Sequence, residues 1–200
     1  KKIRGHSTAV LDGDNIVISR EGKIIITGIE ITFIPNEIET ESFLLRDVVI
    51  GKSFHWEKKE NQRFRGELKF IKEAGKITAV NSILLEEYLT SVVSSEMSAN
   101  SSLELLKAHA IVSRGWLLAQ LEKNKSNGSK KSVNEFITEN EIIRWYDRED
   151  HFNYDLCADD HCQRYQGVTK IINDNAINAV EATRGLVLKY DNKICDTRYS

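Results

Sequence analysis

The sequence contains little proline, little cysteine and no excess of charge of either sign. One proline and 11 glycines among 200 residues exclude collagen-like and linker-dominated chains. Three cysteines are too few for a disulfide scaffold. The 28 basic and 30 acidic residues nearly cancel, whereas a protein that binds duplex nucleic acid through its phosphates usually carries a basic excess. We therefore expect no nucleic-acid partner.

Long apolar runs are also missing from the sequence. Every apolar run is far shorter than the ~20 residues that span a bilayer, so we expect no transmembrane segment. The chain begins at Lys1 without a signal peptide or an initiator Met, and we expect a mature form or an excised portion. With 40% hydrophobic and 29% charged residues, the composition is that of an ordinary globular protein.

The N-terminal third of the chain has the pattern of short β-strands. Its β-branched runs are separated by turn sequences such as Asp12-Gly13-Asp14, in which glycine accepts positive φ and aspartate bonds its own backbone. This pattern predicts a meander of antiparallel strands. The expected strands are 9–11, 15–19, 23–27, 29–34, 64–71 and 77–80.

After these strands the apolar spacing changes to that of helices. It predicts a helix over 84–97 and a buried one over 102–123, the second opened by a capping box of Ser101 and Glu104. The expected later elements are a polar loop at 124–131, a long excursion with little regular structure at 133–165, a strand at 168–172, a helix at 176–183, and a hairpin of 185–190 with 193–195. The fold class is α+β: an N-terminal β-strand meander, a central buried helix pair, and a C-terminal long loop and β-hairpin.

Two cations interrupt the apolar stripe of the second helix. Lys107 and Arg114 are seven residues apart and lie within about 20° of each other around the axis. Unpaired buried charge is unfavourable, so each cation either bridges to a structural carboxylate or lines a cleft that binds a polar ligand.

Glu96 ends the first predicted helix, at the junction with the second. A carboxyl group desolvated at such a junction has a raised pKa, as a general acid near neutral pH requires. The alternative is a surface residue at a helix end.

Three segments of the chain resemble the stage II sporulation protein D (amidase-enhancer) family. Residues 85–114 contain the family's Glu-Met pair and its basic helix positions, with Ser98 in place of the usual proline and His109 in place of the usual glutamine. The other two segments are 155–167, similar to D-x-C-x-x-x-H-C-Q-x-Y-x-G, and 179–188, similar to A-V-x-x-T-x-G-x-V-[LI]. The resemblance covers roughly 62–200, which we expect to form the catalytic domain. Residues 1–60 are then an added β-rich segment packed on the same domain.

The resemblance implies a peptidoglycan lytic transglycosylase with Glu96 as its single general acid and base. The family's H-S-x-x-G-G stretch would begin where this chain stops, so we expect the C-terminal end to be truncated. We also expect Arg114 to line the cleft, so that its removal impairs activity rather than stability. The residues implied in substrate binding are Lys107, Arg114, Gln163, Tyr165 and Arg184.

A cluster of histidine and cysteine in the second motif raises the question of a metal. His151, Cys157, His161 and Cys162 form a donor set that suits tetrahedral zinc. The alternatives are a Cys157–Cys162 disulfide or free thiols packed as small apolar groups. Four protein ligands leave no open position, so we expect no cofactor in the reaction itself and a structural role for zinc.

Two other functions remain open at this stage. One is a non-catalytic module that binds cell wall and stimulates a partner amidase. The other is an intracellular zinc-binding interaction domain, which uses only one of the three motifs. The transglycosylase and the amidase-stimulating module would both lie outside the cytoplasm, in the periplasm, the cell envelope or the medium, with peptidoglycan glycan strands as the partner.

Overall fold

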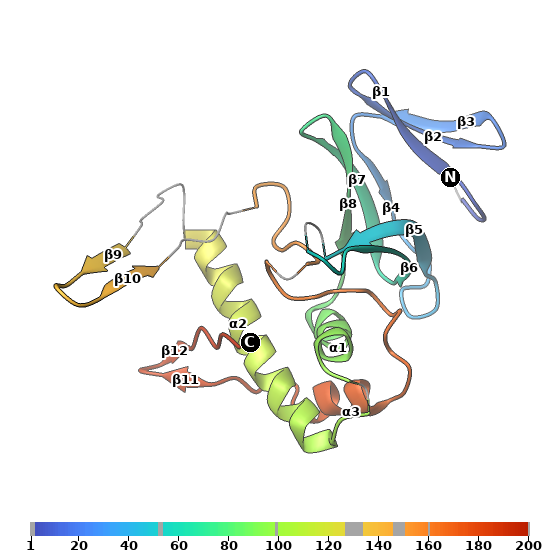
Figure 1. Cartoon of the computed structure of the whole chain (residues 1–200). Helices are drawn as coiled ribbons and strands as arrows, with labels where there is room; N and C mark the ends of the chain where they lie inside the picture. The colour runs from blue at the N-terminus through green and yellow to red at the C-terminus, as the bar shows by residue number, and fades with distance from the viewer. Residues whose placement is uncertain are drawn as a thin grey trace. The chain divides into compact units, whose positions relative to one another are not determined.

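The computed structural model describes residues 3–51, 54–98, 100–126, 134–145, 151–159 and 161–199. The chain divides into two compact units (Figure 1). The β unit comprises Lys1–Ser91 and Gln166–Lys170, and the helical unit comprises Val92–Tyr165 and Ile171–Ser200. The domain boundaries expected from the sequence, 1–60 and 61–200, stay a prediction. Antiparallel strands and helices together confirm the α+β class.

The β unit begins with a three-stranded antiparallel meander in the order β1-β2-β3. Its strands are β1 (Thr8–Asp12), β2 (Asn15–Arg20) and β3 (Lys23–Gly28). Gly13 and Gly22, in the two connecting turns, have φ values of 61° and 74°, which glycine adopts without steric strain. The turn residues therefore end these strands at the positions that the sequence predicts.

Five further strands complete the β unit. One sheet has the order β4-β7-β8, and β5 pairs with β6. Their bounds are β4 (Ile31–Phe33), β5 (Phe43–Ile50), β6 (Lys58–Phe64), β7 (Glu67–Glu73) and β8 (Lys76–Ser82). β5 and β6 were not predicted, because β6 is mostly polar and its strand conformation depends on pairing with β5. The predicted strand 64–71 is split, since Gly66 turns the chain between β6 and β7 with φ 79°.

The core of the β unit centres on three isoleucines. Ile16, Ile18 and Ile31 are 0%, 2% and 3% exposed. The partly buried residues around them are Ala9, Leu11, Phe33, Phe70 and Ile77. Because these residues come from several strands, burial of their side chains joins the meander to the second sheet.

Both long helices occur close to their predicted bounds. They are α1 (Leu85–Glu96) and α2 (Leu103–Ser126). Each buries apolar residues completely, as predicted for a buried pair. The residues with no exposed surface are Leu89, Val92, Val93, Leu106 and Ala110. Among the described residues, no helix combines the length and the hydropathy needed to cross a membrane.

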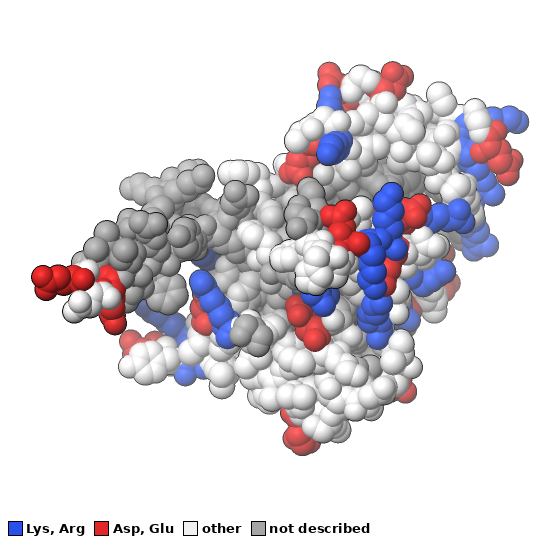
Figure 2. All heavy atoms as spheres, in the orientation of Figure 1, with Lys and Arg blue, Asp and Glu red and all other residues white. Residues whose placement is uncertain are grey.

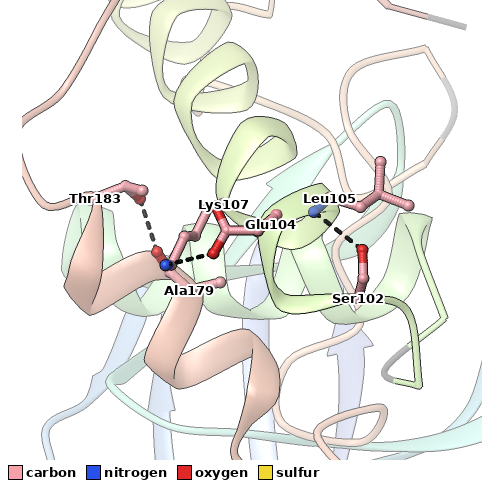
Figure 3. A network of polar contacts seen from close by, with 6 residues as sticks. All are labelled: Ser102, Glu104, Leu105, Lys107, Ala179 and Thr183. Atoms are coloured by element: carbon pink, nitrogen blue, oxygen red, sulfur yellow. Dashed lines mark hydrogen bonds and ion pairs between the residues drawn. The ribbon is translucent and has the colours of Figure 1, made fainter.

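The start of α2 differs from the predicted capping box. The hydroxyl of Ser102, rather than Ser101, accepts the N–H of Leu105 at 3.4 Å (Figure 3). Glu104 therefore lies one position too early to close a capping box, and its carboxylate instead pairs with Lys107 at 2.8 Å. The predicted N-cap is wrong by one residue because two adjacent serines both fit the pattern.

The segment between α2 and α3 is more regular than predicted. β9 (Asn134–Ile137) and β10 (Ile142–Trp145) form a hairpin within the expected irregular excursion. Part of the predicted loop, 124–126, belongs to α2, and 127–131 lie outside the described residues. The predicted strand at 168–172 is wrong. Gln166 accepts the N–H of Thr169 at 3.3 Å, which makes a turn there.

The C-terminal elements of the helical unit agree with the sequence. α3 (Asn175–Ala182) packs on α2. β11 (Lys189–Tyr190) and β12 (Lys193–Ile194) form a short hairpin across Asp191 and Asn192, and β12 contacts α2 (Figure 1). Both turn residues have positive φ, 49° and 60°, as a type I′ turn requires.

Candidate active site and metal site

The carboxylate of Glu96 lies at the last residue of α1 and is held by backbone. Its Oε1 accepts the N–H of Arg164 at 2.7 Å, and the side chain is partly exposed. A charge-assisted hydrogen bond of this length restrains the carboxylate in one orientation. The two family-like motifs, which are 68 residues apart at this contact, therefore meet at the proposed acid.

A buried polar network lies in the same unit. The hydroxyl oxygen of Tyr199 accepts hydrogen bonds from Gln163 Nε2 at 3.0 Å and from Ser113 Oγ at 3.2 Å. Gln163 is 2% exposed, and its amide also donates to the backbone oxygen of Ser113 at 3.3 Å. The network thus joins the middle of α2 to the segment after the cysteine motif and to the C-terminal end of the described chain.

Tyr199 is electrostatically coupled to Glu96. Burial raises the pKa of Tyr199 and the negative charge of Glu96 raises it further, against the hydrogen bonds from Ser113 and Gln163, which lower it. The phenol is therefore protonated at neutral pH and has a proton to donate. Sequence reasoning missed Tyr199 and Ser113, since a lone tyrosine near the chain end and a serine within a helix give no signal.

His109 borders this network on the α2 side. Its Nε2 is 3.3 Å from Ser113 Oγ, and its ring meets that of Tyr199 edge to face at a centroid distance of 4.8 Å. Burial lowers the pKa of His109 to about 4, so the imidazole is neutral near pH 7.

Lys107 is placed at the start of α2, where it pairs with Glu104 (Figure 3). Its side chain is 29% exposed and that of Glu104 is 80% exposed. The pair is an i, i+3 ion pair at the helix surface, where such contacts stabilise by only ~0.2–0.5 kcal/mol. Its proposed contact with substrate stays a prediction.

Arg114 has a different environment from Lys107. It is 1% exposed, and its guanidinium donates to backbone oxygens of Leu186 at 3.1 Å, Val180 at 3.4 Å and Ala110 at 3.5 Å. These bonds join α2 to α3 and to the segment before the C-terminal hairpin. The carbonyl oxygens contribute to compensating the buried charge of Arg114. Its predicted contact with substrate in a cleft stays a prediction.

The remaining predicted binding residues differ in how far they are exposed to solvent. Tyr165 is 6% exposed, and its N–H donates to Ala158 at 3.1 Å. Arg184 is exposed just after α3. The structure therefore brings Gln163 into the network beside Glu96 and places Arg184 at the surface.

The four predicted metal ligands converge in the helical unit. The ligand atoms of His151, Cys157, His161 and Cys162 all lie within 4.8 Å of one another. The Cys157 and Cys162 sulfurs are 3.2 Å apart, and neither cysteine is in a disulfide. His151 Nε2 is 3.4 Å from the Cys162 sulfur, and His161 Nδ1 is 3.8 Å from each sulfur.

Cys157 is polarised toward the thiolate form within this cluster. The hydrogen bond between the Cys157 and Cys162 sulfurs is the largest cause that lowers the pKa of Cys157 to about 4. Burial opposes this shift, while Asp159, His161 and His151 add to it. A thiolate is the form of cysteine that binds metal.

Part of the charge on the visible surface is paired locally. On the face shown in Figure 2, basic and acidic side chains lie beside one another in several places, whereas some acidic groups of the described residues stand alone. In the β unit, ion pairs join Lys58 to Glu60 and Lys69 to Glu30, both at 2.8 Å.

The comparisons with known proteins agree with the arrangement of these motifs. The profile of the family described as stage II sporulation protein matches residues 73–190, more than half of the chain. The chain therefore belongs to this family. The Stage II sporulation protein D of Bacillus amyloliquefaciens is 28% identical to it over 115 residues. Those residues are 58% of this chain and 30% of that relative, so the chain spans less than two thirds of the relative's length.

Proposed function

We propose that this protein is a peptidoglycan lytic transglycosylase that uses Glu96 as its single general acid and base. The observation that supports this most is the Arg164 backbone hydrogen bond that fixes the Glu96 carboxylate, whose charge reaches the protonated, half-buried Tyr199. A positioned carboxyl beside a hydroxyl donor is the arrangement that proton transfer to a sugar oxygen needs. The resemblance to the stage II sporulation protein D family implies a peptidoglycan substrate, and the family match over residues 73–190 supports that implication.

The proposed reaction needs one carboxyl group in two protonation states. Protonated Glu96 gives its proton to the glycosidic oxygen as that bond breaks through an oxocarbenium-like state. The resulting carboxylate then takes the proton from the 6-hydroxyl of the same sugar, whose oxygen bonds to the anomeric carbon. This bond closes a second ring within the same sugar, so no water is consumed.

The other residues of the helical unit would support this chemistry in different ways. Lys107 and Arg184 are accessible cations for the polar or carboxylate groups of the glycan. Gln163 and Tyr165 are too buried to offer substrate a broad contact surface. We expect them to pack beneath the residues that line the site and to hold those residues in position. Arg114 would act by holding α2, α3 and the C-terminal segment together.

We also propose that His151, Cys157, His161 and Cys162 bind a structural zinc ion. With Zn–S near 2.3 Å and Zn–N near 2.0–2.1 Å, tetrahedral ligands lie roughly 3.3–3.8 Å apart. The observed histidine–sulfur separations of 3.4 and 3.8 Å lie within that range, and the 3.2 Å between the two sulfurs is shorter than it. All four ligand atoms lie within 4.8 Å of one another, so a small adjustment would place them around one ion. The ion would hold in place the segment whose Arg164 N–H positions Glu96. With four protein ligands, it would have no open position for catalysis.

The substrate determines where this protein would act. Peptidoglycan lies outside the cytoplasmic membrane, so we place the protein in the periplasm, the cell envelope or the medium. A non-catalytic module that stimulates a cell-wall amidase is the alternative, and it has no need of a positioned acid.

Substitution of the acid tests the proposed function. Glu96→Gln keeps the size of the side chain and an oxygen for the Arg164 N–H, but it removes the ionisable group. We expect it to fold normally and to lose at least ~10²-fold in turnover of glycan strands stripped of stem peptides. Glu181→Gln, an exposed glutamate on α3, is the matched control and should cleave like the wild type. Wild-type turnover by Glu96→Gln would overturn the role of Glu96, and an inactive wild type would favour the amidase-stimulating alternative.

A further inference from the structure

Tyr199, Ser113 and Gln163 form a hydrogen-bonded network, called the Tyr199 network below. The direction of its hydrogen bonds depends on which ring nitrogen of His109 carries the proton. Ser113 lies between His109 Nε2 at 3.3 Å and Tyr199 Oη at 3.2 Å. A serine hydroxyl has a single proton to donate. Ser113 can therefore donate to the histidine or to the tyrosine, but not to both.

The surroundings of His109 favour one tautomer. The imidazole is 4% exposed, and its Nδ1 has no hydrogen-bond partner among the described residues. A buried N–H without a partner is rarer in proteins than a buried acceptor without one. The neutral ring is therefore expected to carry its proton on Nε2, where Ser113 Oγ can accept it, and to leave a bare lone pair on Nδ1.

This tautomer sets the direction of the whole chain of hydrogen bonds. If His109 Nε2–H donates to Ser113, the Ser113 proton is directed to Tyr199 Oη. The same oxygen accepts from Gln163 at 3.0 Å, so both of its acceptor positions are filled. The proton of Tyr199 is then left to donate to a further oxygen. With the opposite tautomer, Tyr199 would donate to Ser113 and its proton would be used within the network.

We propose that His109 is a positioning residue which, through Ser113, makes Tyr199 a hydrogen-bond donor to the sugar that is cleaved at Glu96. This inference rests on the proposed function. Tyr199 and Glu96 are connected through two consecutive residues: Gln163 donates to Tyr199 at 3.0 Å, and the N–H of Arg164 donates to the Glu96 carboxylate at 2.7 Å. A sugar oxygen beside the acid is therefore the natural acceptor. Glutamine at position 109 also has a side-chain N–H, and it should replace the imidazole in this role.

The tautomer can be measured without any activity assay. In protein labelled with nitrogen-15 histidine, the His109 ring is assigned as the signal that is lost in His109→Gln. We expect a neutral ring at pH 7 with hydrogen on Nε2 and none on Nδ1. A ring protonated on Nδ1, or on both nitrogens, would overturn the proposal even if the enzyme is fully active.

A double-mutant cycle tests whether His109 acts through Tyr199. We expect His109→Leu, Ser113→Ala and Tyr199→Phe each to lower kcat about tenfold with little change in KM, whereas His109→Gln should stay within about twofold of wild type. Adding His109→Leu to Tyr199→Phe should lower kcat by no more than about a further twofold. If the two substitutions lower kcat independently, so that their fold-losses multiply in variants that melt cooperatively, the proposal is contradicted while the transglycosylase function stays intact.

If His109→Leu does not fold, Ser113→Ala completes the same cycle. If the wild type itself is inactive, the proposed function fails and the tautomer measurement still decides the network.

Discussion

The backbone N–H of Arg164 donates to the carboxylate of Glu96 over 2.7 Å, although the two residues are 68 positions apart. Arg164 follows Cys162 by two positions, so the segment that orients the acid also carries the proposed zinc ligands. The position of the carboxylate therefore depends on the local structure of the cysteine motif. Loss of the metal or of a ligand thiol should therefore disturb both the local structure and the orientation of Glu96, whereas loss of the acid should affect the reaction alone.

We predict that the protein binds about one equivalent of zinc and that Cys157→Ser loses it. Elemental analysis after gel filtration gives the stoichiometry, and a thermal melt with and without chelator gives the linked stability. Cys195→Ser is the matched control, because Cys195 is not among the four clustered ligands. Protein that contains no metal and has a Cys157–Cys162 disulfide would contradict the zinc assignment.

We predict that Arg114→Ala lowers the free energy of unfolding by about 2–4 kcal/mol, because it removes the hydrogen bonds that join α2 to Val180 and Leu186 and leaves a cavity where a side chain is 1% exposed. This reverses the sequence-based expectation of an activity defect with little loss of stability. Denaturant unfolding measures the change, and Arg184→Ala, which removes an exposed arginine, should cost less than about 0.5 kcal/mol. A stable but inactive Arg114→Ala would restore the cleft assignment.

We predict that His109 makes stability fall as the solution becomes acidic. Its folded-state pKa, about 4, lies below the ordinary value of 6.5, so the unfolded chain binds the proton first as pH falls. This contribution is present above pH 6.5 and is lost progressively as the pH falls to 4. It amounts to as much as ~3 kcal/mol. Unfolding free energies across that range should fall more steeply for wild type than for His109→Gln. Equal slopes would show that the imidazole is not titrating in this way.

We predict that Ser102→Ala destabilises the helical unit by ~1 kcal/mol, because Leu105 loses its capping acceptor. Ser101→Ala is the matched control and should have a much smaller effect. Thermal melts of the two variants distinguish the observed cap from the one predicted by sequence. A larger loss in Ser101→Ala would mean that the cap lies one residue earlier.

Much of the fold was predictable because its local signals agree with its long-range contacts. The turns at Gly13 and Gly22 and the apolar spacing of α1 and α2 each predict an element that packing then preserves. β6 could not be found in this way, because its mostly polar residues become a strand only through pairing with β5.

The candidate site was predictable where the sequence itself marks its residues. Glu96 was indicated by its place at the helix junction and then by the resemblance, and the four clustered ligands were indicated by their donor types and spacing; the structure brings those ligands together. The environment of Arg114 could not be derived, since the carbonyl oxygens of Val180 and Leu186 lie 66 and 72 residues further along the chain. Tyr199 was missed because its importance arises from contacts with Ser113 and Gln163, which are 86 and 36 positions away.

The central claim is that Glu96 cleaves glycan strands without consuming water, and the chemistry of the product tests it most directly. Purified glycan strands stripped of stem peptides are incubated with the protein in isotopically labelled water, and the fragments are weighed by mass spectrometry. The account predicts fragments whose new ends are one water lighter than hydrolysis products and carry no label. Labelled reducing ends would identify a hydrolase. Intact strands, under conditions in which the protein still stimulates a cell-wall amidase, would contradict the enzymatic account altogether.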